Sequence, residues 1–167
     1  QRGCIRGCRF CQAGMIYRPN REKKVDHLKD VAAALIKNTG HDEISLSSLS
    51  SSDYKELDEL ITFLLDICKE KKINISLPSL RIDAFSLDIM QKVQDVKKSS
   101  LTFAPEAGTQ RLRNVINKGL TVDDIMNGSK QAFEGGWNKV KFYFMLGLPT
   151  ETEEDMRGIP ELANDVA

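Results

Sequence analysis

Four short segments of the chain alternate strictly between apolar and polar side chains, and helical patterns lie between them. In the third segment, Leu101 and Phe103 alternate with Thr102 and Ala104. A period of two is that of a β-strand whose two faces meet different surroundings. Because helical stretches separate the segments, the pattern predicts parallel strands with right-handed crossovers and not antiparallel hairpins. The predicted strands are Ile44–Leu46, Asn74–Leu77, Leu101–Ala104 and Val140–Met145.

The segment Tyr54–Lys72 shows the helical pattern best. Its apolar residues recur every three or four positions and end at Cys68, which is therefore predicted to pack in the core and not to bind a ligand. The other predicted helices are Leu28–Asn38, Ser86–Val96, Thr121–Phe133 and a segment after Thr152. Capping boxes are predicted at three helix starts, from Asp53 with Glu56, Thr121 with Asp124, and Thr150 with Glu153.

The polar face of these strands constrains the fold further. Parallel strands that helices cover on both faces usually read as continuous apolar runs. Here one face of each strand carries mostly polar or small side chains, which predicts a curved sheet whose concave face holds a ligand. A complete eight-unit barrel needs about 250 residues, and this chain has 167. We therefore expect an α/β fold in which a partial (β/α) TIM-type barrel of parallel strands is open on one side.

The order of the segments predicts which part of the barrel is present. The cysteines near Gln1 would follow a strand, so the first strand is expected to lie before this residue. Residues 1–167 would then be one domain, a core fragment of a larger protein whose flanking domains are absent. Ligands of such sheets gather at the carboxyl ends of the strands. Those ends are rich in small, turn-forming or polar residues, at 47–49, 78–81, 105–108 and 147–149.

The composition argues against some classes of partner. Basic and acidic residues number 24 each, so the net charge is zero and nothing draws the whole domain toward nucleic acid or an anionic membrane. A basic cluster, which could touch a phosphate, is interpreted as a solvated loop. Its members are Arg18, Arg21, Lys23 and Lys24. No apolar run approaches the roughly 20 residues of a membrane span, and no signal peptide precedes the cysteines, which indicates a cytoplasmic protein.

Three of the four cysteines, Cys4, Cys8 and Cys11, form the pattern C-x-x-x-C-x-x-C. In a cytoplasmic protein, clustered thiols indicate a metal centre before a disulfide. A structural zinc site needs four protein ligands, and the two histidines, His27 and His41, stand alone. Three thiolates suffice for an iron–sulfur cubane with one iron open to a non-protein ligand. A structural zinc-binding module and an iron–sulfur electron carrier without turnover remain alternatives.

This cysteine spacing, with Phe10 just before the last cysteine, resembles the signature of the radical S-adenosylmethionine (radical SAM) superfamily. The similarity extends to two later segments, LTFAPEAGTQRLRNVINKG and VKFYFMLGLPTETEED. These resemble the fourth- and fifth-strand regions of a subgroup that includes cobalamin-domain-bearing members and methylthiotransferases. The resemblance covers essentially the whole chain, and it implies the partial barrel of that family.

The resemblance also implies an enzyme that holds a [4Fe–4S] cluster through Cys4, Cys8 and Cys11. S-adenosylmethionine would bind the fourth iron through its amino and carboxylate groups, and an external one-electron donor would reduce the cluster. Reductive cleavage would release a 5′-deoxyadenosyl radical that abstracts hydrogen from an unknown substrate. Cobalamin is implied only as a possible cofactor of the parent protein. Neither nucleic acid nor a membrane is indicated as a partner.

The family's cofactor contacts carry over unevenly to the first strand ends. Phe10 would lie against the adenine region. Ser47 and Ser48 stand where many relatives have Gly-Gly-Glu, which contacts the methionine amino group. No glutamate follows here, so backbone or hydroxyl groups would make that contact. Arg81 would pair with the methionine carboxylate in a bidentate way, or else form a surface ion pair.

The later strand ends match the family more fully. Glu106 stands at the family's ribose-binding position, and it shares the polar parity of its strand, which independently predicts that it points inward. Met145, Gly147 and Leu148 resemble the adenine-contacting motif of the fifth strand. The acidic residue of that motif falls one place late, at Glu151.

Overall fold

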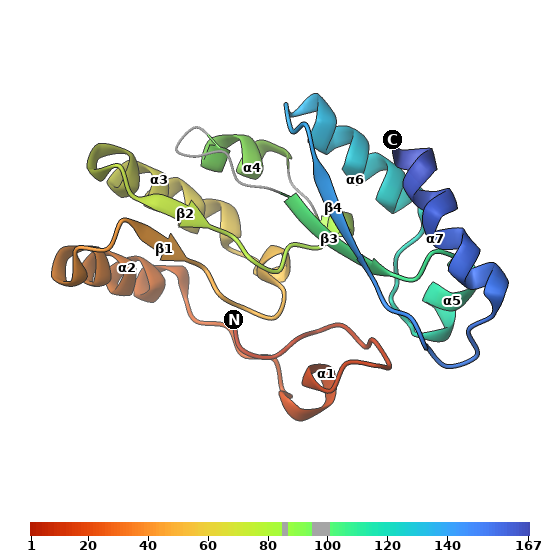
Figure 1. The fold of residues 1–167 in the computed structure, drawn as a ribbon. Helices are drawn as coiled ribbons and strands as arrows, with labels where there is room; N and C mark the ends of the chain where they lie inside the picture. Colours follow the sequence, from red (N-terminus) through yellow and green to blue (C-terminus); the bar gives the residue numbers. More distant parts are fainter. Residues whose placement is uncertain (85–86, 95–100) are drawn as a thin grey trace.

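The computed structural model describes residues 1–84, 87–94 and 101–167. Its strands form two parallel pairs, in which Ile44 lies opposite Ile75 and Phe103 lies opposite Phe142 (Figure 1). No ladder joins the two pairs within the described residues. The predicted strands and their parallel pairing are therefore confirmed. Their bounds are β1 Glu43–Ser45, β2 Asn74–Ser76, β3 Leu101–Glu106 and β4 Val140–Phe144.

The longer helices lie where the sequence predicts them, with bounds that differ by up to three residues. They are α2 Val25–Thr39, α3 Leu57–Lys71, α4 Leu87–Gln94, α6 Val122–Glu134 and α7 Glu153–Val166. Positions 86, 95 and 96 of the predicted Ser86–Val96 helix lie outside the described residues. The structure adds four short elements that the pattern did not predict, α1 Ala13–Ile16, α5 Gln110–Val115 and the 3-10 turns η1 Ser51–Asp53 and η2 Ile82–Ala84. Among the described helices, none combines the length and apolarity needed to cross a membrane.

Burial along the strands follows the predicted period of two. Buried and half-buried residues alternate through β3, and β4 alternates between half-buried and exposed residues. Phe103 of β3 packs with Ile125 of α6 and Leu162 of α7, so the apolar face of this strand pair lies against helices. The alternate residues of β3, which are Thr102, Ala104 and Glu106, face the other side of the sheet.

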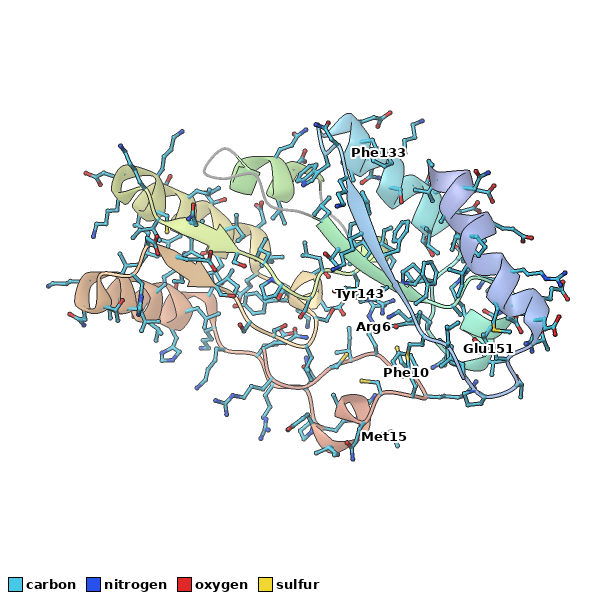
Figure 2. The ribbon with its side chains drawn as sticks, in the orientation of Figure 1. Arg6, Phe10, Met15, Phe133, Tyr143 and Glu151 are labelled. Atoms are coloured by element: carbon cyan, nitrogen blue, oxygen red, sulfur yellow. The ribbon has the colours of Figure 1, made fainter. Side chains whose placement is uncertain are left out.

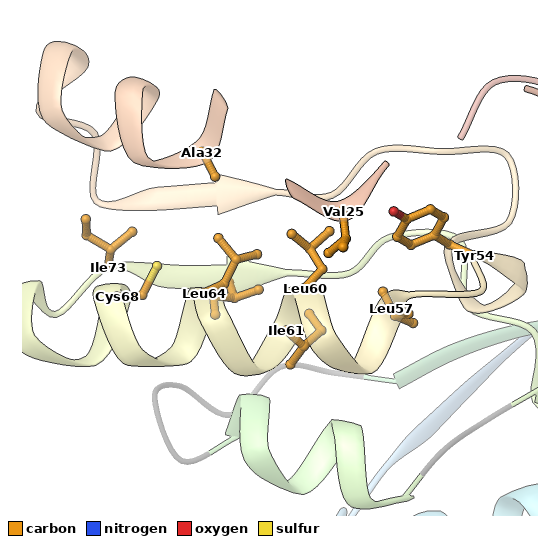
Figure 3. Close-up of a cluster of buried hydrophobic side chains, with 10 residues drawn as sticks. Val25, Ala32, Tyr54, Leu57, Leu60, Ile61, Leu64, Cys68 and Ile73 are labelled. Carbon is orange, nitrogen blue, oxygen red and sulfur yellow. The ribbon is translucent and has the colours of Figure 1, made fainter. Parts of the chain in front are cut away.

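A separate core lies between α2, α3 and the β1–β2 pair (Figure 3). Leu60, Ile61 and Leu64 project from α3 into this core, and Cys68 continues the same stripe. Cys68 is fully buried, and this burial raises the pKa of its thiol. The predicted packing role of Cys68 is confirmed.

One of the three predicted capping boxes is confirmed. Thr121 and Asp124 exchange hydrogen bonds at the start of α6, as predicted. The box at the start of α7 pairs Thr152 with Asp155, so the prediction of Thr150 with Glu153 is wrong by two residues. Thr150 has a left-handed backbone with a φ of 63°, which is incompatible with the extended conformation of an N-cap residue.

The prediction that Asp53 caps a helix is also wrong. Helix α3 begins only at Leu57, and no side chain caps it. The carboxylate of Asp53 instead accepts hydrogen bonds from Ser50 at 2.7 Å and from the guanidinium of Arg6. Burial by itself would raise the pKa of Asp53, but these hydrogen bonds outweigh it and hold the pKa below its ordinary value. Asp53 therefore serves a contact with the cysteine segment and not a helix end.

Candidate functional site

The cysteine loop, residues 4–11, lies against the segment that follows α5. The backbone N–H of Arg9 donates to the carbonyl of Ile116 at 2.8 Å. Asn117 Nδ2 donates to the carbonyl of Gly7, also at 2.8 Å. The loop is thus tied on both sides of its second cysteine to the chain that follows β3, more than 100 residues later in the sequence.

Arg6 ties the same loop to the segments that follow β1 and β2 (Figure 2). Its guanidinium donates to both carboxylate oxygens of Asp53, at 2.5 and 3.0 Å, and to Asp83 at 3.3 Å. The hydrogen bond with Asp53 is the main reason that the pKa of Arg6 is raised. Because Arg6 lies between the first two cysteines and its partners follow separate strands, the loop is fixed across the strand ends.

The three cysteines are half-buried free thiols. The N–H of Cys11 donates to the carbonyl of Cys8 at 3.1 Å, which closes a tight turn between them. Within the described ranges, no three Cys, His, Asp or Glu side chains stand together in the arrangement of a metal site, so the sulfurs would have to draw together on binding. The donor set itself, three free thiols on one anchored loop, fits an iron–sulfur cluster that keeps one position for a non-protein ligand.

Glu106 ends β3 in an unusual backbone conformation, with a φ of 71°, next to an irregularity in the β3–β4 register. Its carboxylate accepts a hydrogen bond from Lys118 Nζ at 3.0 Å, and both side chains are largely buried. Lys118 Nζ also lies 5.9 Å from the centre of the Phe10 ring. One lysine thus joins the predicted ribose-binding residue to the aromatic residue of the cysteine loop.

The end of β4 lies beside Glu106. The N–H of Met145 donates to the carbonyl of Glu106 at 2.8 Å. Leu148 is buried with residues of α5 and the β3–α5 connection, and Met145 packs against the same cluster. Gly147, with a φ of 82°, donates its N–H to Glu151 Oε2 at 2.6 Å. Glu151, which stands one position after the acidic residue of the family motif, thus closes the turn that carries Gly147.

The structure places Arg81 within an ion pair. Its Nε and Nη2 donate to the two carboxylate oxygens of Asp83 at 2.9 and 3.0 Å, and Nη2 also reaches the carbonyl of Lys118 at 3.3 Å. Arg81 therefore stands near the Glu106–Lys118 pair, but its bidentate partner is Asp83.

The two serines are not joined to the other predicted site residues by any hydrogen bond that we find in the described part of the chain. Ser48 Oγ accepts the N–H of Ser50 at 3.0 Å, and Ser47 lies 3.5 Å from Ser45, measured between the two hydroxyl oxygens. Both serines line a cavity of about 220 Å³ that lies along β1, between α2 and α3, and contains neither the cysteines nor Glu106. This cavity is mostly apolar, and apart from the two serines it contains none of the predicted cofactor-binding residues.

Three basic residues of the site escaped the sequence prediction, namely Arg6, Lys118 and Arg113. Arg113 is fully buried, and its guanidinium donates to the carbonyls of Ala107 and Gly108 at 3.0 and 2.9 Å. Burial lowers the pKa of Arg113. The bonds fix the turn that follows Glu106. No local pattern marks these residues, since each acts through partners that only the fold brings close.

A sequence profile described as the Radical SAM superfamily matches residues 1–163, a range that includes the cysteine loop and every strand end just described. The chain belongs to the radical SAM superfamily. The family resemblance that the cysteine spacing and the two later segments predict is confirmed.

Two proteins of Methanocaldococcus jannaschii are similar to this radical SAM chain over most of its length. One, named "Uncharacterized protein MJ0966", is 42% identical over 165 residues, which cover 99% of this chain and 36% of that protein. The other, named "Putative methylthiotransferase MJ0865", is 27% identical over 161 residues, which cover 92% of this chain and 35% of that protein. The chain therefore spans about a third of the length of these relatives.

Among solved structures, the coproporphyrinogen III oxidase HemN from Escherichia coli, a radical SAM enzyme, has a similar fold. Its TM-score is 0.68 at 14% sequence identity, and the match covers 98% of this chain and 40% of that chain. At this identity the likeness supports the fold alone. It agrees with the α/β arrangement of parallel strands that the sequence predicts.

Proposed function

We propose that residues 1–167 are the core of a radical SAM enzyme, in which Cys4, Cys8 and Cys11 hold a [4Fe–4S] cluster and the strand ends bind S-adenosylmethionine. These groups supply the one-electron cleavage that yields a 5′-deoxyadenosyl radical for hydrogen abstraction. The observation that carries the proposal is the anchoring of the cysteine loop at the strand ends, where Lys118 contacts both Phe10 of the loop and Glu106.

Glu106 is proposed to accept hydrogen bonds from the ribose hydroxyl groups. Its position at the end of β3 and its left-handed backbone turn the residue out of the regular strand. The ammonium group of Lys118, 3.0 Å away, holds the carboxylate in place. A charged acceptor in a largely buried setting forms stronger hydrogen bonds than a neutral one, so Glu106 is suited to fix a polyhydroxylated ligand.

The adenine end of the ligand is proposed to lie among Phe10, Met145 and Leu148. Phe10 and Met145 offer partly exposed apolar surface, and Leu148 anchors the turn in a buried cluster. The Gly147–Glu151 hydrogen bond keeps the backbone of that turn in one conformation. Apolar side chains on a fixed turn would exclude water from the reacting groups.

The methionine end of the ligand is proposed to meet Arg81, Ser47 and Ser48. Arg81 now holds Asp83, so a ligand carboxylate would have to replace or share that bidentate partner. Ser47 is exposed and its hydroxyl is available to an amino group.

We also propose that the two strand pairs belong to one open, partial barrel. Both pairs are parallel, Arg6 links the segments that follow β1 and β2, and Arg81 links the segment after β2 to the carbonyl of Lys118. The match to HemN over 98% of this chain supports the same arrangement. A cytoplasmic location is proposed with it, since reducing conditions keep three neighbouring thiols free.

Anaerobic reconstitution of the protein with iron and sulfide tests the proposal. The expected result is a cubane EPR signal after reduction and release of 5′-deoxyadenosine from S-adenosylmethionine with dithionite as the electron source. One tightly bound zinc without iron would support a structural zinc module instead. A reducible cluster without affinity for S-adenosylmethionine would support an electron carrier.

A further inference from the structure

The first 24 residues carry a net positive charge, which a net negative charge on the rest of the chain balances. They contain seven Arg or Lys residues and one acidic residue, Glu22, which gives this segment a net charge of +6 in a chain whose net charge is zero. The remaining 143 residues therefore carry −6. Arg6 is paired with Asp53 and Asp83, and the other cations of the segment would attract anionic partners.

The structure holds these charges on an anchored loop. Two backbone hydrogen bonds of 2.7 Å join Arg2 to Arg21 and close the loop at its base. Arg18 donates to the carbonyls of Gly14 and Arg6, at 2.5 and 3.1 Å, and it stays exposed, as do Arg21, Lys23 and Lys24, in agreement with the interpretation of this basic cluster as a solvated loop.

Nine of the exposed residues of this segment form what we call the basic–apolar surface, and the acidic Glu22, between Arg21 and Lys23 in the sequence, is exposed as well. Its members are Arg2, Ile5, Met15, Ile16, Tyr17, Arg18, Arg21, Lys23 and Lys24. Met15 has 79% of its surface exposed and lies on the side of the cysteine loop away from the strands, whereas Phe10 lies on the side nearer to them (Figure 2). In the part of the chain that the structure describes, none of the five cations forms an ion pair.

The antiparallel bridge between Arg2 and Arg21 brings two cations of this surface together. Residues directly opposite each other in an antiparallel bridge place their side chains on the same side, and like charges in that arrangement repel. An anionic group on the partner would remove this repulsion.

We propose that the basic–apolar surface docks an acidic one-electron carrier protein of the ferredoxin type. This inference rests on the proposed function, which requires a donor to pass one electron to the group held by the cysteine loop. The reduced carrier loses that electron and leaves in its oxidised form. The first 24 residues carry both this surface and the three cysteines, so a carrier bound there would lie near the electron's destination.

The apolar members favour a protein partner over a nucleic acid. Met15, Ile5 and Ile16 are aliphatic, and methionine together with arginine is enriched in protein–protein interfaces. Single-stranded nucleic acid is bound instead by cations combined with aromatic side chains that stack on bases. Tyr17 is the one aromatic member of this surface.

The test compares two triple charge reversals in the reconstituted protein. Arg21→Glu/Lys23→Glu/Lys24→Glu changes the basic–apolar surface and leaves the cysteines and the strand ends untouched. Lys37→Glu/Lys130→Glu/Lys139→Glu makes the same change of charge at exposed positions elsewhere. Binding of a fluorescently labelled, oxidised acidic ferredoxin is measured at low salt and at about 0.5 M salt, where surface charges are screened. The release of 5′-deoxyadenosine is measured with dithionite and with the reduced carrier.

The expected result is a Kd for the carrier that rises roughly tenfold or more in the first variant at low salt, and much less at high salt. The control variant should bind the carrier within about twofold of the unsubstituted protein. Dithionite-driven cleavage should be unchanged in both variants, because this small reductant needs no docking surface.

Equal effects of the two variants, or none, with dithionite-driven cleavage intact would overturn the docking surface alone. Absence of cleavage with dithionite in the unsubstituted protein would overturn the proposed function and, with it, this inference. If the first variant lost affinity for a transfer RNA while its carrier affinity stayed unchanged, the surface would be one for nucleic acid and the proposal would be wrong.

Discussion

Lys118 Nζ lies 3.0 Å from Glu106 Oε1, and this largely buried pair stands between the cysteine loop and the end of β3. The ammonium group contacts the carboxylate and lies 5.9 Å from the centre of the Phe10 ring, and the family resemblance assigns both Glu106 and Phe10 to the cofactor site. The first prediction concerns this carboxylate.

Glu106→Gln is expected to raise the Kd for S-adenosylmethionine about tenfold. Hydrogen bonds to a charged acceptor contribute about 1.5 kcal/mol more than hydrogen bonds to a neutral one, and about 1.4 kcal/mol corresponds to a factor of ten. Equilibrium titration of the reconstituted protein measures the change. Glu134→Gln, at an exposed position of α6, removes the same charge and should leave the Kd unchanged. Equal affinity of the Glu106 variant and the unsubstituted protein would remove Glu106 from the proposed site.

Cys4→Ala and Cys68→Ala each remove one thiol with opposite consequences. Cys4→Ala should abolish cluster binding with little change in far-UV circular dichroism, because Cys4 is half-buried on a loop. Cys68→Ala should keep its iron but lower the free energy of unfolding by about 1 kcal/mol, since it removes a buried side chain. Iron analysis and urea unfolding distinguish the two. Unfolding of the whole domain in Cys4→Ala would favour a structural zinc site.

The strands could be predicted from the sequence because each has one buried face. Phe103 packs against helices, whereas Glu106, three residues later, pairs with Lys118 on the other face of the strand. The alternation of apolar and polar residues in the sequence predicts this difference between the two faces. The core role of Cys68 followed from helical spacing in the same way. Apolar residues that recur every two positions in a strand, or every three to four in a helix, show which face of that element is buried. The packing of these buried faces then determines the fold.

The contacts that fix the site could not be predicted in this way. Arg6 and Asp53 are 47 residues apart, and nothing near Arg6 in the sequence marks its partner. The choice between Thr150 and Thr152 as a helix cap was equally open, because both precede acidic residues at suitable spacing. The carbonyl of Thr150 accepts from Arg111 at 2.8 Å, a tertiary contact in the segment whose backbone excludes Thr150 as a cap.

Arg6→Gln should loosen the cysteine loop without unfolding the domain. The substitution removes the charged hydrogen bonds to Asp53 and Asp83, which join the loop to two strand ends. We expect faster cleavage within residues 1–24 in limited proteolysis and faster loss of iron to a chelator. Arg157→Gln, at an exposed site on α7, is the matched control. Unchanged proteolysis of the Arg6 variant would show that the Arg9–Ile116 and Gly7–Asn117 bonds suffice to hold the loop.

The carboxylate of Asp155 makes the stability of the domain depend on acid pH. Hydrogen bonds from Arg111 and then from Thr109 and Thr152 lower the pKa of this nearly inaccessible group, although burial opposes them. A native pKa below the ordinary value near 3.9 means that the contribution of Asp155 is fully present above about pH 4 and is lost as the pH falls toward the native pKa.

Asp155→Asn should therefore reduce the urea midpoint near neutral pH, and the difference from the unsubstituted protein should shrink toward about pH 3. The asparagine keeps the size of the side chain but not the charge that Arg111 contacts. Asp165→Asn, at an exposed position of the same helix, should change the midpoint little at either pH. A difference between Asp155→Asn and the unsubstituted protein that stays constant from neutral to acid pH would mean that the network stabilises α7 by packing alone and not through the charge of Asp155.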